Sequence, residues 1–156
     1  FCAKLLKEQM PGHLYLGCRF HENIYNGNNV IVQKAASRHV DVMSYNIYKT
    51  SIDQVQTHQE VDRPNLIGEF HFGTGSHGVW GYGLVPCDTL EDQAALYSIY
   101  VKETFEHPDF VGAHWFKWSD HPTTGRYDGE NYRIGFVNIV DRSYGPLTKA
   151  IHKTAS

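Results

Sequence analysis

Short, nearly apolar runs alternate along this chain with longer stretches that have the periodicity of helices. Such alternation is typical of repeated strand–helix units, in which parallel strands form a sheet and helices cover it. Because the runs are apolar throughout, we expect each strand to be buried on both faces. Four strands are predicted, at residues 13–20, 40–48, 65–72 and 110–118.

Helices are predicted between and after these strands. The clearest covers 89–106, because Thr89 and Asp92 form a capping-box pattern and the dipeptide His107-Pro108 ends the segment. Residues 1–10 have the pattern of the end of a further amphipathic helix. The other predicted helices cover 28–38, 51–60 and 145–154.

Four strand–helix units suit either an open doubly wound sheet or part of a (β/α)8 barrel. The glycine-rich phosphate loop of nucleotide-binding sheets is absent, since Gly73-Thr74-Gly75 lacks both the third glycine and the start of a helix. A whole barrel needs about 250 residues. The sequence therefore predicts an α/β fold in which residues 1–156 are half of a (β/α)8 (TIM) barrel. The chain begins at Phe1 without an initiator Met, so we expect it to be a fragment of a larger chain.

Charge and hydropathy exclude several classes of partner. With 14 basic and 17 acidic side chains the formal charge is -3, and no run of Lys and Arg stands out, so we expect no nucleic-acid partner. No apolar run approaches the roughly 20 residues of a membrane span, so no membrane partner is expected either. Aromatic residues make up 13% of the chain, enough to build a core and to leave rings for ligand binding.

A single carboxylate interrupts the third apolar run near its carboxyl end. Burying the charge of Glu69 without a partner or a role would cost several kcal/mol, on the order expected for an isolated buried ion. Two interpretations remain open from the pattern alone. Glu69 is either ion-paired with an arginine at the strand terminus or a catalytic carboxylate facing a cleft, with His71 two residues further along the same strand face.

Other polar and aromatic residues lie where strands end, the place at which α/β folds build their sites. The long loops 73–88 and 119–144 follow the third and fourth strands. Trp faces stack on the apolar faces of sugar rings, and Tyr hydroxyls orient carboxylates. The candidates are Asn46 and Tyr48 on one face of the second strand, Arg19 and His21 at the end of the first, Trp115, Trp118 and Asp120 from the fourth, and Arg126, Asp128 and Glu130 in the last loop. Of these, Glu130 is interpreted as a solvated loop residue.

No sequence motif of a metal site or of a serine hydrolase occurs in this chain. His71 and His77 are six residues apart, which matches no familiar zinc spacing, and neither HExxH nor HxH occurs. The GxSxG motif is absent, since Gly75-Ser76-His77-Gly78 is only a loop fragment. We expect no metal and no cofactor.

The segments HLYLGCRF, DVMSYNIY, RPNLIGEFHFG, GLVP and VGAHWFKWSDHPTTGRYDGENYRIGFVNIVD together resemble the C-terminal half of the catalytic barrel of glycoside hydrolase family 50, the β-agarases. The resemblance runs from about residue 11 to 150, and the pairing of GEFHFG with HWFKWSDHPTTGRYDGENY is the most specific part of it. It implies a retaining (β/α)8 glycosidase whose strands five to eight are the four strands of this chain.

The resemblance also implies roles for individual residues. Glu69 falls on the nucleophile position that ends strand seven, and Tyr48 falls where the clan keeps a tyrosine that hydrogen-bonds the nucleophile. Trp115 or Trp118 falls on the aromatic floor of the subsite at the scissile bond, and the pattern does not decide between the two. The further implied substrate contacts are His71, Asn46, Arg19, Asp120 and Arg126.

The implied reaction is a double displacement on a β-galactosidic linkage of agarose-type galactan. The acid/base Glu that ends strand four lies outside this chain, so we expect the isolated fragment to be inactive and to need the N-terminal half of the barrel. A parent enzyme that acts on polymeric galactan would be secreted or periplasmic. Two alternatives remain: a β-galactosidase or other galactan hydrolase of the same clan, and a half barrel that binds sugar without hydrolysing it.

Overall fold

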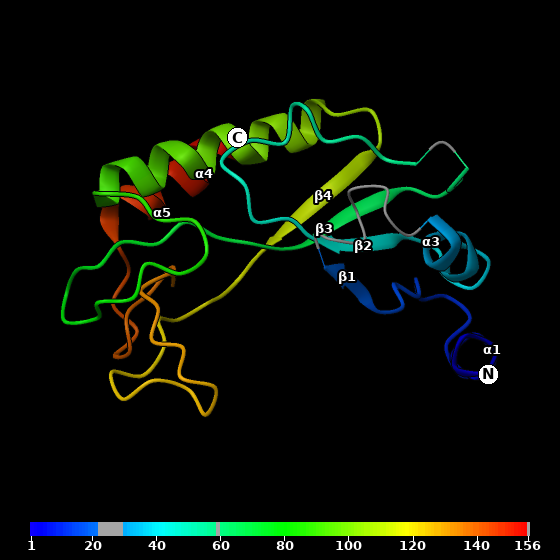
Figure 1. Cartoon of the computed structure of the whole chain (residues 1–156), viewed down its shortest axis with the longest axis horizontal. Helices are drawn as coiled ribbons and strands as arrows, with labels where there is room; N and C mark the ends of the chain where they lie inside the picture. Colours follow the sequence, from blue (N-terminus) through cyan, green and yellow to red (C-terminus); the bar gives the residue numbers. More distant parts are fainter. Residues whose placement is uncertain (22–29, 59, 156) are drawn as a thin grey trace.

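The computed structural model of this chain describes residues 1–21, 30–58 and 60–155. Within these residues four parallel strands form one sheet, and their order along the sheet is their order in the sequence (Figure 1). An α/β fold with a parallel sheet is thereby confirmed. The elements are α1 (Cys2–Gln9), β1 (Arg19–His21), α3 (Val30–Ser37), β2 (Met43–Asn46), β3 (Asn65–Phe70), α4 (Leu90–Glu106), β4 (Phe110–Trp115) and α5 (Gly145–Thr154).

The longest helix, α4, begins and ends where its sequence requires. The Thr89 hydroxyl accepts a hydrogen bond from the Asp92 amide at 3.0 Å, and the Asp92 carboxylate accepts one from the Thr89 amide at 3.1 Å. This reciprocal pair is the capping box that the sequence predicts. The helix ends before His107, because the following proline disfavours helical backbone at that residue.

Aromatic side chains of β3 and α4 form the centre of the core. The Phe70 ring stacks on Tyr100 with centroids 4.3 Å apart and planes at 5°, and Tyr97 lies on the same side of the sheet at 6.2 Å. Each ring of this size contributes roughly 1.5–3 kcal/mol when it is fully buried. Helix α4 therefore covers one face of the sheet, and α5 packs against α4, as Figure 1 shows.

All four predicted strands are too long, and the third, expected over 65–72, ends at Phe70. The first was expected over 13–20, but β1 covers only Arg19–His21, because Gly17 has φ +65 and interrupts the extended backbone. The second and fourth end at Asn46 and Trp115, short of the expected 48 and 118. The expectation of burial on both faces is wrong for both edge strands, since Arg19 and His21 of β1 are exposed and Val111 of β4 is 57% exposed.

The helix predicted over 51–60 is wrong as well, within the part of that range that the structure describes. Ile52 and Val55 are buried there, but a side chain of α4 satisfies the backbone, because the Ile52 amide donates to Glu103 Oε2 at 2.8 Å. His107 Nε2 lies 2.9 Å from the Val55 carbonyl. Apolar residues three apart, such as Ile52 and Val55, can therefore reach the core without a helix, because a neighbouring helix supplies hydrogen-bond partners for the backbone.

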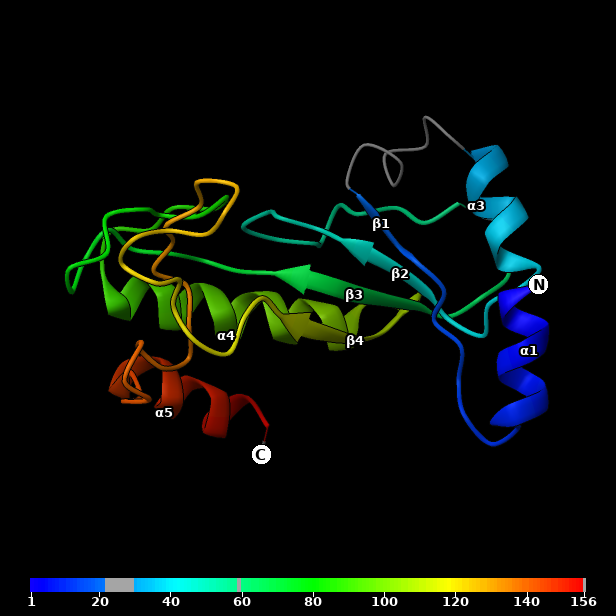
Figure 2. The ribbon, with the colours of Figure 1, turned by 90° about the horizontal axis from the view of Figure 1, so that it is seen from below.

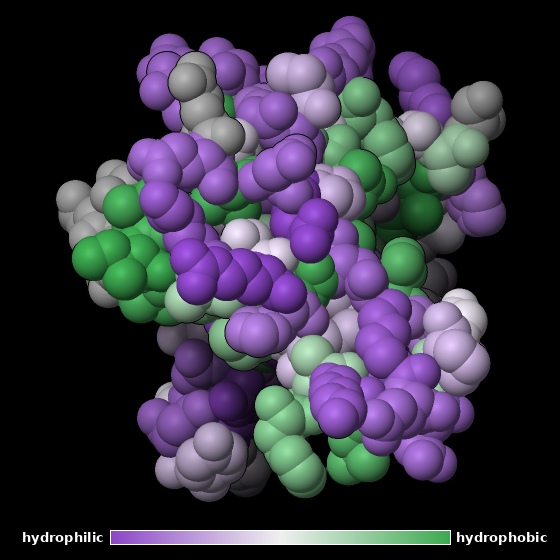
Figure 3. Space-filling model, turned by 90° about the vertical axis from the view of Figure 1, so that its right-hand side faces the viewer, coloured by the Kyte–Doolittle hydropathy of each residue, from purple (hydrophilic) through white to green (hydrophobic). Residues whose placement is uncertain are grey.

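The end of the molecule that carries α1 and α3 has a largely hydrophilic surface with smaller hydrophobic areas, as Figure 3 shows. The predicted helix at 28–38 begins in residues that lie outside the described part of the chain, and its described part is α3. Among the described helices, none combines the length and the apolar character needed to cross a membrane.

Candidate active site

The two long loops gather at the carboxyl ends of β3 and β4 (Figure 2). They pair with each other at single positions, since Gly81 bridges to Tyr132 and the Arg133 amide donates to the Gly81 carbonyl at 2.9 Å. In parallel sheets this edge is where ligands bind. Glu69, the second-last residue of β3, lies at this edge.

A β-bulge decides which way Glu69 points. Tyr45 is opposite Ile67, but Asn46 is opposite Glu69, so Gly68 is one extra residue in β3. Without the bulge, simple alternation would put Glu69 on the face of Ile67, among the covering helices. With it, Glu69 shares a face with Asn46, away from those helices.

Three donors converge on the Glu69 carboxylate. Asn46 Nδ2 and the Tyr48 hydroxyl both donate to Oε2, at 2.7 and 2.8 Å, and Arg19 Nη1 lies 2.8 Å from Oε1. Arg19 Nη1 also donates to the Gly68 carbonyl at 3.2 Å. The Glu69 side chain is 15% exposed, so its carboxylate is held in one orientation but remains open at the edge of the sheet. Of the two interpretations left open, the arginine ion pair is present, and it is compatible with a catalytic role.

Tyr48 stays protonated beside this carboxylate. Burial first, and then its hydrogen bond to Glu69, raise the pKa of Tyr48 far above the usual range. The negative charge of Glu130 raises the pKa of Tyr48 further, and Arg19 lowers it. Tyr48 is therefore a permanent hydrogen-bond donor to Glu69.

His71 lies behind Tyr48 and is only 1% exposed. Its ring centroid is 4.7 Å from that of Tyr48, and its Nε2 accepts a hydrogen bond from the Leu84 amide at 2.8 Å. Because Nε2 accepts, the proton of the neutral ring sits on Nδ1. Burial lowers the pKa of His71 to about 4, so the ring is uncharged at neutral pH.

The loop 119–144 brings a second group of side chains to the same edge. His121 stacks on Tyr132 with centroids 5.1 Å apart, and Tyr132 lies 6.1 Å from His71. Glu130 Oε2 is 3.1 Å from Arg126 Nη1 and 4.0 Å from His121 Nε2. Glu130 is thus ion-paired and only 31% exposed, which corrects its interpretation as a solvated loop residue.

Asp120 forms hydrogen bonds within the loop 119–144. Its carboxylate accepts hydrogen bonds from the Gly135 amide at 2.7 Å and from the Tyr144 hydroxyl at 2.5 Å. Arg133 packs over the Tyr144 ring at 4.0 Å and donates to Gln93 of α4. Since both oxygens of Asp120 are occupied and the residue is 3% exposed, the structure does not bring it to the Glu69 site.

Of the two candidate tryptophans, Trp115 lies on the helix side of β4 and Trp118 lies on the surface beyond the end of the strand. Trp115 is opposite Phe70 in the sheet, stacks on Phe136 at 5.2 Å and donates from Nε1 to the Ile134 carbonyl. Phe70 faces α4, so Trp115 lies on the face opposite Glu69. Trp118 is 67% exposed and contacts Phe136 edge-on at 6.3 Å.

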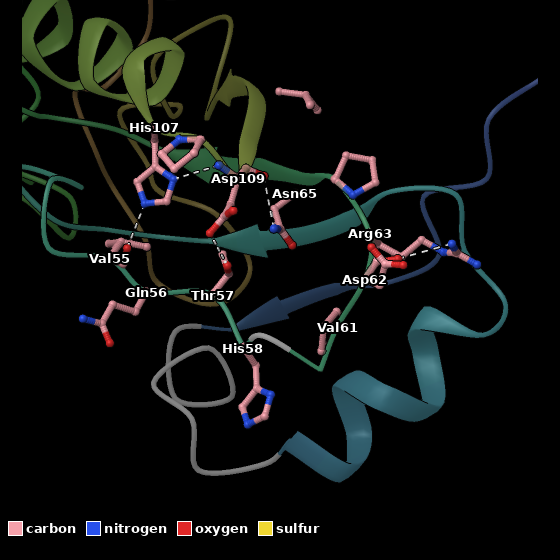
Figure 4. Close-up of a pocket in the computed structure, with 13 residues that line it drawn as sticks. Val55, Gln56, Thr57, His58, Val61, Asp62, Arg63, Asn65, His107 and Asp109 are labelled. Carbon is pink, nitrogen blue, oxygen red and sulfur yellow. Dashed lines mark hydrogen bonds between the residues drawn. The ribbon is translucent and has the colours of Figure 1, made fainter.

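A polar cavity of about 920 Å³ lies at the other end of the strands, where β3 and β4 begin (Figure 4). Asn65 Nδ2 donates to the Asp109 carbonyl there, and the Asp109 carboxylate accepts from Thr57. This cavity is therefore separate from the Glu69 edge. In the described part of the chain, no three or more His, Cys, Asp or Glu side chains gather as ligands for a metal ion.

Three site residues escaped the sequence reasoning. Phe116, His121 and Tyr132 surround His71, with the Phe116 ring 6.1 Å from His71 and 6.4 Å from His121. No local spacing marks His121 and Tyr132, because they meet only through the path of the loop. Phe116 could have been found as the residue after β4, within the aromatic run HWFKW.

Curated relatives match nearly the whole chain. β-Agarase B of Vibrio sp. (strain JT0107) is 43% identical over 152 residues, which are 95% of this chain and 16% of the relative. β-Agarase A of the same strain is 43% identical over 153 residues, 93% of this chain and 15% of the relative. The chain thus spans about a sixth of the length of these relatives. No protein-family model matches the chain.

A solved structure of an agarase, AgWH50C, has the same fold over this segment. It superposes with a TM-score of 0.89 and 42% identity, covering 99% of this chain and 22% of the agarase. The resemblance drawn from the sequence motifs is confirmed.

Proposed function

We propose that this chain, homologous to a segment of the β-agarases of glycoside hydrolase family 50, is the nucleophile half of the catalytic (β/α)8 barrel of a retaining galactan hydrolase. The observation that carries the proposal is the Glu69 carboxylate. It lies at the carboxyl end of a parallel strand, faces away from the helices, and is oriented by Asn46, Tyr48 and Arg19.

The proposed reaction is a double displacement. Glu69 Oε1 or Oε2 attacks the anomeric carbon of a galactose unit as the glycosidic bond breaks, and a covalent glycosyl-enzyme forms. A second carboxylic acid, about 5–5.5 Å from Glu69, protonates the leaving oxygen and later deprotonates the water that releases the sugar. That acid/base residue belongs to the half of the barrel that lies outside this chain.

The side chains around Glu69 have distinct tasks in this reaction. Tyr48 and Asn46 share Oε2 and fix the rotation of the carboxylate, while Arg19 offsets its charge at Oε1. As Glu69 becomes an ester its negative charge falls, and the same donors can turn to the oxygens of the sugar.

Substrate contacts beyond the nucleophile are proposed for Trp118 and Arg126, whereas Trp115 and Asp120 are proposed to act only through their neighbours. Trp118 is exposed at the rim and offers a face for stacking on a sugar ring. Arg126 is held beside Glu130 in the loop that borders Tyr48. Trp115 and Asp120 support Phe136 and the loop from below, so their effect on substrate would pass through those neighbours.

The barrel as a whole is also part of the proposal. Among the described residues, β1 and β4 are the two edges of the sheet, and closing a barrel would pair each with a strand of the other half. We propose that the partner of this segment is that N-terminal half. The substrate is agarose-type galactan, and a polymer of that kind requires a secreted or periplasmic parent enzyme.

The test uses the full-length parent enzyme and agarose. Glu69→Gln should lower kcat by at least about 10⁴-fold, as expected for loss of a covalent nucleophile, and azide should restore turnover to Glu69→Gly with inverted product stereochemistry. Glu106→Gln, the same change at an exposed position of α4, is the matched control and should keep wild-type kcat. Turnover by Glu69→Gln near the wild-type rate would refute the nucleophile. Activity on aryl galactosides but not on agarose would point to the β-galactosidase alternative, and binding of agarose without any turnover to a sugar-binding half barrel.

A further inference from the structure

We infer that His71 is a positioning residue, which presses Tyr48 against Glu69 and connects the nucleophile to the loop 73–88. The inference rests on the proposed function, because it assigns His71 a task at the same carboxylate. It replaces direct contact with substrate, the role that the sequence resemblance implies for His71.

His71 cannot reach a substrate directly. It is 1% exposed, and the Tyr48 ring covers it, with centroids 4.7 Å apart and planes at 59°. The hydroxyl of that same Tyr48 donates to Glu69 Oε2 at 2.8 Å. Of the rings around His71, that of Tyr48 is nearest, so a movement of the His71 ring changes the position of the Tyr48 hydroxyl.

The loop 73–88 fixes His71 from the other side. The Leu84 amide donates to His71 Nε2 at 2.8 Å, and a Cβ at Gly83, where φ is +72, would lie 2.5 Å from the same nitrogen. Only glycine allows the backbone to come this close to the ring. The two ends of the loop also bond to each other. The Gly73 amide donates to the Val85 carbonyl at 3.0 Å and the Cys87 amide donates to the Gly73 carbonyl at 2.9 Å, so the end of the loop is held close to the end of β3.

The chemistry of imidazole suits this place. Nε2 must accept, because the Leu84 amide can only donate, and a ring that accepts there is neutral. A neutral ring adds no charge beside the Tyr48–Glu69 pair. Phenylalanine would keep the shape but remove the acceptor of the partly buried Leu84 amide, whereas glutamine can place an oxygen near the position of Nε2.

The test is a double-mutant cycle in the full-length enzyme, with kcat and KM measured on an agaro-oligosaccharide. Tyr48→Phe should lower kcat by roughly 10- to 100-fold, the range for loss of a hydrogen bond to a charged group. His71→Phe should lower kcat by about 3- to 10-fold with KM nearly unchanged, because a shifted donor is weakened but not lost. In the Tyr48→Phe background, His71→Phe should change kcat by less than about twofold, because the bond through which it acts is gone. His71→Gln should restore part of the loss.

Each outcome separates the two proposals. If Tyr48→Phe keeps wild-type kcat, the positioning role is refuted, because the bond through which His71 would act does not affect the rate, whereas the nucleophile is tested separately by Glu69→Gln. If Tyr48→Phe lowers kcat but the effect of His71→Phe multiplies with it, the nucleophile stands and the positioning role is refuted. Should His71→Phe not fold, the cycle with His71→Gln decides in the same way. His152→Phe, the same replacement at an exposed position of α5, is the control and should leave kcat within about twofold in both backgrounds.

Discussion

Replacing Gly68 by alanine should separate Arg19 from Glu69. A Cβ at position 68 would lie 2.4 Å from Arg19 Cδ and 2.5 Å from Ser44 Oγ, closer than the 3.0 Å limit that real Cβ atoms respect. Ser44 is buried in the neighbouring strand and cannot retreat, but the Arg19 side chain is half exposed and can. We therefore expect the guanidinium to leave both the Glu69 carboxylate and the Gly68 carbonyl.

The size of the effect follows from what is lost. An added methyl group in a packed site costs roughly 1–3 kcal/mol of unfolding free energy. The ion pair is partly screened by solvent, because the Arg19 side chain is 50% exposed, so its loss at the proposed nucleophile should cost about 1 kcal/mol, or roughly fivefold in kcat. The assays are denaturant unfolding and initial rates of agarose hydrolysis by the full-length enzyme.

Gly112→Ala is the matched control on β4. A Cβ there would meet only Leu66 Cδ1, at 3.4 Å, which is an ordinary van der Waals contact. We expect kcat to stay at the wild-type value in this variant. If Gly68→Ala also kept wild-type kcat, with Arg19 still against Glu69 in its crystal structure, the prediction from the close approach at Gly68 would be refuted.

Three further predictions concern stability and assembly. The pKa of His71 is about 4 in the folded protein and near 6.5 in the unfolded chain, so the unfolded chain takes up a proton first as the pH falls. The unfolding free energy should therefore fall by about 3 kcal/mol between pH 6.5 and pH 4. Denaturant titrations across this range should show a weaker dependence of the unfolding free energy on pH in His71→Gln. Thr89→Ala should lower the unfolding free energy by about 1 kcal/mol through loss of the helix cap. Thr123→Ala, at an exposed loop position, is the control and should leave the unfolding free energy unchanged. An equal loss in both variants would contradict a stabilising role of the Thr89 cap. Residues 1–156 alone should aggregate or dimerise through the edges of the sheet, and light scattering that found a monodisperse, cooperatively melting 17.8 kDa monomer would contradict this.

Local signals were enough to predict much of the fold. The capping box at Thr89 and the break at Pro108 fixed the bounds of α4, because both act within a few residues. The apolar runs located all four strands, and their order followed from short strand–helix repeats. Strand ends were harder to predict, since Gly17 and the loop after Trp115 change the backbone without changing hydropathy.

The orientation of the site could not be predicted in this way. The direction of Glu69 depends on the bulge at Gly68, and a bulge is a property of how two strands pair. The choice between Trp115 and Trp118 has the same origin, because one residue of register moves a side chain to the other face. His121 and Tyr132 join the site only through loop contacts, for which the sequence holds no spacing rule.

The most direct test of the account is to trap the covalent intermediate on the full-length enzyme with a 2-deoxy-2-fluoro-β-galactoside carrying a good leaving group, and to sequence the labelled peptide by mass spectrometry. We expect one fluorinated sugar per enzyme molecule, attached to the Glu69 carboxylate in the peptide that contains GEFHFG. A label on any other residue, or full turnover of agarose by an enzyme that never becomes labelled, would contradict it.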